Sequence, residues 1–270
     1  MEKIRKGIIP AAGMGTRMHS LARGQIKEML LIGGKPMISY AVCEAVLSGL
    51  EELYIVVNER KESLRRYLES EQLQKDLQAE GWKGRTFSLR LTFIDQPAPL
   101  GSGEAIYRVR ELVGEEPFAL MMPDFIFFGR TPALDQMIPL YQRFELDTIG
   151  VLSLGAREAK GFGNVGIIEK RERKPGVVEV RGLSGKHPGA LILKEDKKIL
   201  KGVGRWILGP HFFSYLERTK GWEEEWDDTP ALQMICEERE VMGKVLEGRG
   251  FDVGNPVGYR AAQRFAAGGS

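Results

Sequence analysis

Residues 7–17 of the chain read GIIPAAGMGTR, an apolar run that ends abruptly at a glycine-rich loop. This pattern predicts the end of a β-strand, followed by a loop that binds phosphate groups. Gly13 and Gly15 lack a Cβ atom, so backbone N–H groups can approach an anion closely and φ can become positive. Arg17 adds a planar guanidinium suited to phosphate oxygens, and Lys27 follows as a compact positive charge.

The loop differs from two well-known phosphate loops. It contains no GxxxxGK[ST] sequence, and Gly13, Gly15 and Met18 do not complete GxGxxG. An ordinary strand-to-loop connection that carries an arginine by chance is the alternative interpretation. Residues outside the loop are therefore needed to decide.

Composition excludes several classes of protein. The chain has 270 residues, of which 43% are hydrophobic and 28% charged, as expected for a soluble globular protein with a full core. Its 39 basic and 37 acidic residues give a net charge of +2, which argues against a broad surface for nucleic acid or membrane. Any phosphate binding must therefore come from a few placed cations.

The sequence indicates a cytoplasmic protein. The apolar piece near the N-terminus is too short for the core of a signal peptide, and no segment approaches the ~20 apolar residues that span a bilayer. Cys43 and Cys236 are far apart and lack metal-type spacing, so reduced, buried thiols are expected. The oligomeric state, including a homo-oligomer, is left open.

Strands and helices alternate in the first half of the chain. Strands are predicted at 53–57, 89–96, 118–122 and 148–152, with helices after Pro36, over 61–77 and around 105–113. This order predicts an α/β fold with a mainly parallel central sheet and helices on both faces. Ligands of such sheets bind at the carboxyl ends of the strands, where the 13–17 loop, Gln96, 101–103 and Asp124 fall.

The second half is more β-rich. Strands at 164–169 and 177–183, joined by a charged turn over 170–176, are followed by a strand at 204–208 and helices over 229–240 and 256–266. We expect a single domain over residues 1–265. It would include a small β-rich subregion on the substrate side, at about 155–235, and a flexible tail over 266–270.

Two segments together resemble a known family. GMGTRM at 13–18 and KEML at 27–30 resemble the nucleotide-sugar pyrophosphorylases, most closely the bacterial UTP–glucose-1-phosphate uridylyltransferases. The resemblance implies a Rossmann-like nucleotide-diphospho-sugar transferase fold. It also implies a reaction in which a nucleoside triphosphate, with UTP favoured, and a sugar 1-phosphate give a nucleotide-sugar and pyrophosphate.

Two aspartates are candidate metal ligands. Asp124 follows a buried apolar strand, where a carboxylate is unfavourable unless it is paired or coordinates a cation. Its segment resembles the family's L-P-D, and Asp252 lies in a match to D-x-G-N-x-x-G-Y. The resemblance implies that both bind Mg²⁺, which takes one or two protein carboxylates when it also holds nucleotide phosphates. The alternative role of Asp124 is a helix cap or a turn, and that of Asp252 is to organise the turn before the last helix.

The nucleotide is expected on the loop side. Gln96 and the 100–105 segment resemble the family's Q-x4-G-x-G-x-A, which implies that the glutamine reads the base edge and that the glycines let the backbone approach the nucleoside. A side-chain amide has one acceptor and two donors, which suits uracil or thymine. A plain loop is the alternative. The predicted nucleotide-binding residues are Ala11, Ala12, Gly13, Gly15, Thr16, Gln96, Gly101 and Gly103.

The sugar side matches the family less well. Phe162-Gly163 resembles the aromatic-Gly pair, which implies a sugar contact by the Gly163 amide. The family's V-E-K-P has its best counterpart at 183–188, where Lys186 would hold the sugar phosphate but Gly185 replaces the glutamate; Lys194 is a competing placement for the lysine. Glu225 fits the family pattern poorly, and a solvated acidic run is expected there.

The resemblance assigns the catalytic roles. Arg17 and the loop amides would hold the β- and γ-phosphates, Lys27 would bridge the reacting phosphates, and Lys186 would position the acceptor phosphate. Positioning and charge neutralisation do most of the work in such a transfer.

Three alternatives remain open: a nucleotide-binding paralogue with impaired catalysis, a dTTP-dependent thymidylyltransferase, and a metal-dependent glycosyltransferase. The last needs a D-x-D motif, and the sole Asp-Asp pair is at 227–228. The sugar itself is not determined by the sequence.

Overall fold

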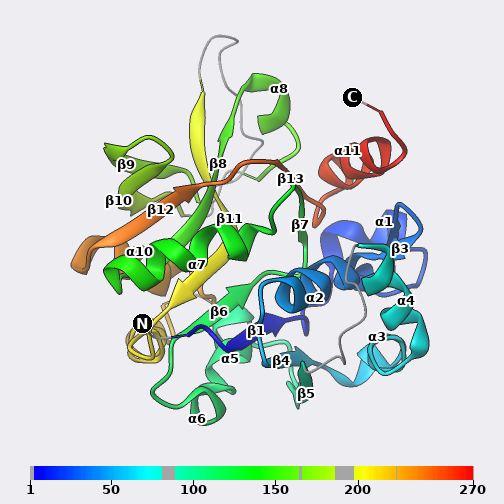
Figure 1. Cartoon of the computed structure of the whole chain (residues 1–270). Helices are drawn as coiled ribbons and strands as arrows, with labels where there is room; N and C mark the ends of the chain where they lie inside the picture. The colour runs from blue at the N-terminus through cyan, green and yellow to red at the C-terminus, as the bar shows by residue number, and fades with distance from the viewer. Residues whose placement is uncertain (1–2, 81–88, 164–165, 186–197, 223, 270) are drawn as a thin grey trace.

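A nine-stranded mixed sheet forms the centre of the computed structural model, which describes residues 3–80, 89–163, 166–185, 198–222 and 224–269 (Figure 1). Its strand order is β5-β4-β1-β6-β11-β8-β12-β10-β9. The strands are β1 Lys6–Pro10, β4 Glu52–Val57, β5 Arg90–Asp95, β6 Phe118–Met121, β8 Thr148–Leu154, β9 Ile168–Lys174, β10 Val177–Leu183, β11 Ile199–Leu208 and β12 Val241–Val245. Two small sheets pair β2 (Leu31–Ile32) with β3 (Lys35–Pro36) and β7 (Phe125–Phe128) with β13 (Arg249–Asp252).

The predicted α/β fold with a mainly parallel sheet is confirmed. β5, β4, β1 and β6 are mutually parallel, and β8 is parallel to β12. β11 runs antiparallel to both β6 and β8 and joins the two parallel parts. The residues expected to form a substrate-side subregion therefore also contribute a strand to the middle of the sheet.

Helices cover both faces of the sheet (Figure 1). The described helices are α1 His19–Ala22, α2 Met37–Leu47, α3 Glu62–Leu68, α4 Glu71–Ala79, α5 Ser102–Tyr107, α6 Arg110–Val113, α7 Ala133–Phe144, α8 Ala156–Ala159, α9 Phe212–Thr219, α10 Thr229–Glu238 and α11 Pro256–Ala266. Alternate residues of β1 face different cores: Ile9 packs with α2 and α7, and Ile8 with α5, α9 and α10. Within the described ranges, no helix is both long and apolar enough to cross a membrane.

Three predicted elements differ from the structure, and one of them, the helix expected around 105–113, is two short helices, α5 and α6. The single helix expected over 61–77 is two helices, α3 and α4, that meet near Ser70. Both still bury the predicted leucines, because their apolar faces belong to the same core cluster as residues of α2 and β4. The predicted charged turn over 170–176 was wrong in extent: residues up to Lys174 belong to β9, and the turn is Pro175-Gly176. β9 lies at the edge of the sheet, where charged side chains remain solvated.

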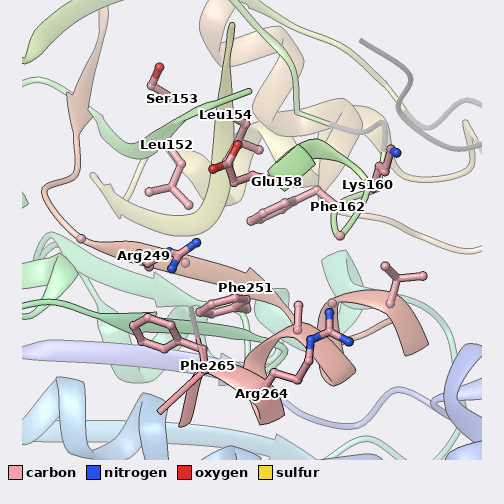
Figure 2. A pocket seen from close by; sticks show the side chains of 17 residues that line it. Leu152, Ser153, Leu154, Glu158, Lys160, Phe162, Arg249, Phe251, Arg264 and Phe265 are labelled. Carbon is pink, nitrogen blue, oxygen red and sulfur yellow. The ribbon is translucent and has the colours of Figure 1, made fainter. Parts of the chain in front are cut away.

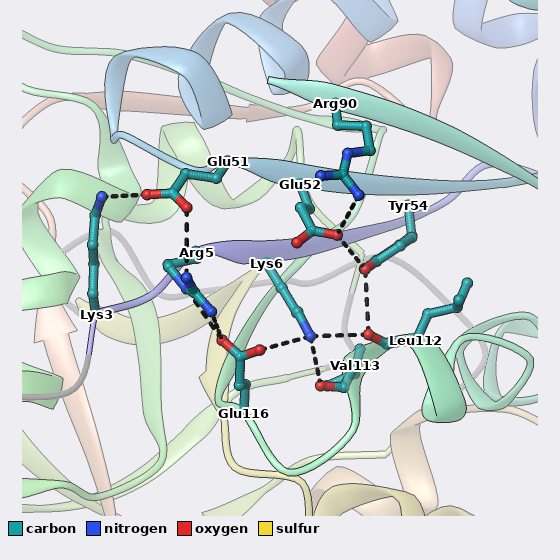
Figure 3. A network of polar contacts seen from close by, with 10 residues as sticks. All are labelled: Lys3, Arg5, Lys6, Glu51, Glu52, Tyr54, Arg90, Leu112, Val113 and Glu116. Carbon is teal, nitrogen blue, oxygen red and sulfur yellow. Dashed lines mark hydrogen bonds and ion pairs between the residues drawn. The ribbon is translucent and has the colours of Figure 1, made fainter. Parts of the chain in front are cut away.

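A network of ion pairs lies at the amino ends of the parallel strands (Figure 3). Glu116 accepts from Arg5 and from Lys6, each at 2.8 Å, and Lys6 also donates to the carbonyls of Leu112 and Val113 at 3.0 Å. The cations lower the pKa of Glu116, with the hydrogen bond from Lys6 as the largest cause. At this end of the sheet the Glu116 carboxylate is thus paired with two cations.

Candidate active site

The loop after β1 has the backbone that its glycines predict. Gly15 has φ +66°, a left-handed conformation that favours glycine, and its carbonyl accepts from the Met18 N–H at 2.9 Å. A Cβ at Gly15 would lie 3.2 Å from the side chain of Lys27, so the loop packs closely on that lysine. Asn58 also holds the loop, because its side-chain amide donates to the Ala12 carbonyl.

Lys27 and Asp124 form the central ion pair. Lys27 lies in a short 3₁₀ helix, Lys27–Met29, and its Nζ donates to Asp124 Oδ2 at 3.0 Å. Burial is the largest influence and would raise the pKa of Asp124, but the charge and hydrogen bond of Lys27, together with the charge of Arg17, outweigh it and leave that pKa below its ordinary value. Glu28, fully buried, accepts from Lys61 at 2.5 Å and lies 4.0 Å from the Lys27 ammonium. Lys27 is therefore charged and fixed in place.

A buried arginine positions the turn that carries Asp124. Arg205, which is 0% exposed, donates to the carbonyls of Met122 and Phe125 at 2.7 and 3.0 Å, on either side of that turn. Its Nε donates to Glu44 at 3.1 Å, which balances the buried charge. The predicted strand that contains Arg205 was correct, but this supporting role was missed.

β-Pairing brings Asp252 beside Asp124. In the β7–β13 pair Asp252 stands opposite Phe125, and the Val253 N–H donates to the Asp124 carbonyl at 2.8 Å. The two Asp252 oxygens accept from the N–H groups of Gly254 and Gly163 at 3.1 and 3.3 Å. Burial, and then the charge of Asp124, raises the pKa of Asp252. The two carboxylates thus repel each other in a space that favours an added cation.

The residues around this pair fit a divalent cation. A Cβ at Gly254 would lie 2.5 Å from Asp124 Oδ2, so glycine leaves open the space in front of that carboxylate. Among the described residues, no group of three or more His, Cys, Asp or Glu side chains could hold a metal ion. Two carboxylates match the one or two protein ligands that Mg²⁺ usually takes when it also binds nucleotide phosphates.

Two cavities meet at Asp124. One, of about 360 Å³, is lined by the 12–17 loop, Lys27, Gln96 and Gly101. The other, of about 260 Å³, is lined by residues from β11, the end of β10 and the start of α10, together with Asp252. Both share a wall that contains Arg17, Ser102, Met122, Asp124 and Asp227. The carboxyl ends of β1, β5 and β6 therefore converge on one site, as their order predicts.

The nucleotide-side residues differ in how they are placed. Gln96 is 2% exposed, and its amide donates to the Gly101 carbonyl at 2.9 Å and to Glu104 at 2.7 Å, which uses both amide hydrogens. Ala11 lies behind the loop in the core, with its N–H bonded to the Val56 carbonyl. Only the acceptor oxygen of Gln96 is left by these bonds for a base.

The two glycines at 101 and 103 are needed for chain packing. A Cβ at Gly101 would lie 2.3 Å from the Trp226 carbonyl oxygen, and one at Gly103 would lie 2.8 Å from the Asp227 carbonyl oxygen. The Gly103 N–H also donates to the Trp226 carbonyl at 2.8 Å. Gly101 lines the larger cavity, whereas Gly103 is buried beneath the Trp226-Asp227 segment.

The predicted sugar-side residues are partly described. Gly163 lines the smaller cavity, and its N–H, predicted to contact a sugar, donates to Asp252. Ser184 lines the same cavity, and a Cβ at the adjacent Gly185 would lie 3.2 Å from Gln233 Nε2. Lys186 and Lys194 lie outside the described residues.

Two acidic residues and one lysine of the site were missed. Asp227 and Asp228 are 7% and 6% exposed, so the prediction of a solvated acidic run does not hold for this pair. Burial, and then the charge of Asp227, raises the pKa of Asp228 to about 7. Lys201, on β11, is 3% exposed beside Asp252, and burial lowers its pKa to about 8. No local sequence signal marks these residues, because their burial arises from distant packing.

A further cavity, of about 420 Å³, lies between β8, α8, β13 and α11 (Figure 2). Phe251 and Phe265 face Leu152 and Phe162 across it, with Arg249 and Arg264 at its side. None of the site residues predicted from the sequence lines this cavity. The predicted site residues that line a cavity therefore gather at the pair of cavities at Asp124.

Comparison with known proteins agrees with this geometry. A family model described as nucleotidyl transferase matches residues 6–268. The chain belongs to the nucleotidyl transferase family. It is 33% identical to the UTP–glucose-1-phosphate uridylyltransferase YngB of Bacillus subtilis (strain 168), over 95% of this chain and 87% of that protein. It is also 33% identical to the corresponding uridylyltransferase of Mycoplasma pneumoniae, over 99% of this chain and 94% of that protein.

Solved structures of this family share the fold. A UDP-glucose pyrophosphorylase complexed with UDP-glucose is 28% identical, with a TM-score of 0.79, covering 98% of this chain and 99% of that one. A UTP-bound enzyme of the same kind from Acinetobacter baumannii is 28% identical, with a TM-score of 0.75, covering 97% and 93%. The family resemblance of the loop and strand-end motifs is thus confirmed, while the roles of individual site residues remain predictions.

Proposed function

We propose that this chain condenses UTP with glucose 1-phosphate to give UDP-glucose and pyrophosphate. The observation that carries the proposal is the meeting of two cavities at Asp124, with Lys27 and the glycine loop on one side and Asp252 on the other. The named uridylyltransferases among its relatives support the choice of substrates. The triphosphate occupies the larger cavity and the sugar 1-phosphate the smaller one.

The reaction is a single displacement. An oxygen of the sugar phosphate forms a bond to the α-phosphorus of UTP, the bond from that phosphorus to the α–β bridging oxygen breaks, and pyrophosphate leaves with the electron pair. Arg17 and Lys27 neutralise the triphosphate, while the loop amides hold it in place. Mg²⁺, which Asp124 and Asp252 would hold, would supply further neutralisation of the phosphate charge. Because the two substrates meet at Asp124, the chain aligns them for attack.

In this proposal the substrate-side subregion, at about 155–235, forms the wall of the cavity that binds the sugar. Most of the lining of the smaller cavity comes from residues between 155 and 235, namely Phe162, Gly163, Gly166, Leu183, Ser184, 201–204, Trp206, 227–229 and Leu232. Sugar selection would therefore depend on β10, β11 and the start of α10.

The test is product formation with a matched panel of substrates. UTP and dTTP are each combined with glucose 1-phosphate and other sugar 1-phosphates, in Mg²⁺ or in excess EDTA, and both pyrophosphate and nucleotide-sugar are measured. We expect UDP-glucose with UTP, glucose 1-phosphate and Mg²⁺, and none in EDTA. Failure of every pair to release pyrophosphate would refute the proposal. Faster turnover with dTTP than with UTP would show that dTTP is the preferred nucleotide.

A further inference from the structure

Each of the two facing aspartates has a lysine of its own. Lys27 donates to Asp124, and Lys201 lies close enough to Asp252 for its charge to act on that carboxylate. The two lysines line different cavities of the site, and Lys27 follows the loop after β1 whereas Lys201 lies on β11. The family resemblance assigned a role to Lys27 but none to Lys201.

Lys201 is fixed by the strands around it. Its backbone stands opposite Leu152 of β8 and forms a bridge with Ile167. The Nζ atom lies 6.0 Å from the centre of the Phe162 ring and 3.9 Å from the position that a Cβ at Gly166 would take. Phe162 and Gly166 both line the smaller cavity, so the ammonium group is held at its wall.

The cations are divided between the two cavities. Among the described residues, Lys27 lines the larger cavity and not the smaller one, Arg17 lines both, and Lys201 lines only the smaller one. The wall of the smaller cavity also carries four carboxylates, those of Asp124, Asp227, Asp228 and Asp252. An anionic substrate that enters this cavity needs a positive group to offset that wall, and Lys201 is placed to provide it.

The chemistry requires an anion at this position. In a displacement at the α-phosphorus, the attacking phosphate oxygen must approach within about 3–3.5 Å, so two phosphate groups lie side by side. A compact ammonium with three donors can hold one of them at the distance of a charge-assisted hydrogen bond.

We propose that Lys201 binds the phosphate group of the sugar 1-phosphate and holds it beside Asp252 for attack. This assignment rests on the proposed function and adds Lys201 to Lys186, for which the family resemblance predicts the same role and which lies outside the described residues. In this account Lys27 binds the phosphates that leave as pyrophosphate, and Lys201 binds the phosphate of the attacking sugar 1-phosphate. Removal of the Lys201 side-chain charge should therefore weaken binding of the sugar 1-phosphate far more than binding of UTP.

The experiment is steady-state kinetics of Lys201→Met, which keeps much of the side-chain volume and removes the charge. We expect the KM for glucose 1-phosphate to rise about 10- to 100-fold, as for loss of a charge-assisted hydrogen bond, with the KM for UTP changed little. Lys201→Arg should recover part of the acceptor affinity. Lys198→Met, an exposed lysine on the same segment, is the matched control and should behave as wild type.

The alternative is that Lys201 only offsets the charge of Asp252. Lys201→Met would then alter the Mg²⁺ dependence and leave the KM for glucose 1-phosphate unchanged, which would overturn the assignment. Thermal unfolding checks that each variant is folded, and Lys201→Gln replaces the Met variant if that one is not. No product from wild type would refute the proposed function itself, whereas normal product with an unchanged acceptor KM in the variant refutes the Lys201 assignment alone.

Discussion

Charged side chains gather at both ends of β5, β4, β1 and β6, but the two ends are arranged differently. At the amino ends, Glu116 and Glu51 each accept from basic side chains, and those hydrogen bonds lower the pKa of both carboxyls (Figure 3). At the carboxyl ends, burial and a neighbouring aspartate raise the pKa of Asp252 and of Asp228. One end is electrostatically satisfied, whereas the other carries carboxylates that repel each other.

The difference separates a structural cluster from a functional one. Ion pairs near the surface hold strand ends together, and each contributes little where water screens the charges. Buried like charges are unfavourable in the isolated chain, so they persist where a ligand offsets them. Removing a carboxylate should therefore have opposite effects at the two ends: loss of stability at one, and gain of stability or loss of activity at the other.

The largest effect is expected for Lys27→Met. It removes the cation that faces the triphosphate and leaves Asp124 without its 3.0 Å partner. We expect kcat/KM to fall by about 10²- to 10³-fold, as for loss of a preorganised charge at a reacting phosphate. Pyrophosphate release measures this, with exposed Lys75→Met as the control. Wild-type kcat/KM in Lys27→Met would place the reacting phosphates elsewhere.

A smaller effect, on stability, is expected for Asp228→Asn. The pKa of Asp228 lies at about 7 in the folded chain against 3.8 ordinarily, so the folded state retains a proton that the unfolded state releases. The free energy of unfolding of wild type should therefore fall as pH rises through this range. The variant keeps the oxygen that accepts from Ser102 and loses this slope.

Above pH 7, Asp228→Asn should be more stable than wild type, by roughly 4 kcal/mol at most, given about 1.4 kcal/mol per unit of pKa shift. Denaturant unfolding at several pH values measures the difference, and the exposed Asp135→Asn controls for the loss of one charge. Equal pH slopes in wild type and Asp228→Asn would mean that this carboxylate is not buried against Asp227.

The smallest effect is expected for Glu116→Gln, at the other end of the strands. It breaks the pairs with Arg5 and Lys6 and should lower the unfolding midpoint by a few degrees at most. Neither kcat nor KM should change, since the network lies at the opposite end of β1 from the loop. A large loss of activity would show that the two ends are coupled.

The sequence predicts those parts of the site in which a residue directly follows the end of a strand. The loop after β1, Gln96 after β5 and Asp124 after β6 converge because parallel strands bring their carboxyl ends to one edge. Asp252 joins them through the β7–β13 pairing. Local patterns were sufficient there, since the order of strands and helices determines which ends meet.

Other features depend on contacts between distant segments. Asp227 and Asp228 look like part of a solvated acidic run, yet the chain before them packs on the start of α5, where Leu100 and Gly103 form hydrogen bonds with Trp226. Lys201 shares its strand with Arg205 among apolar residues and glycines, and its neighbour Asp252 is far away in the chain. Pairing and burial of this kind cannot be read from residue spacing.

Pyrophosphate release from UTP and glucose 1-phosphate by wild type, Asp124→Asn and Glu116→Gln, assayed side by side in Mg²⁺, tests the central claim most directly. The account predicts turnover by wild type and Glu116→Gln, and a ~10²-fold loss in Asp124→Asn, where the two cavities meet. Wild-type turnover in Asp124→Asn would contradict it.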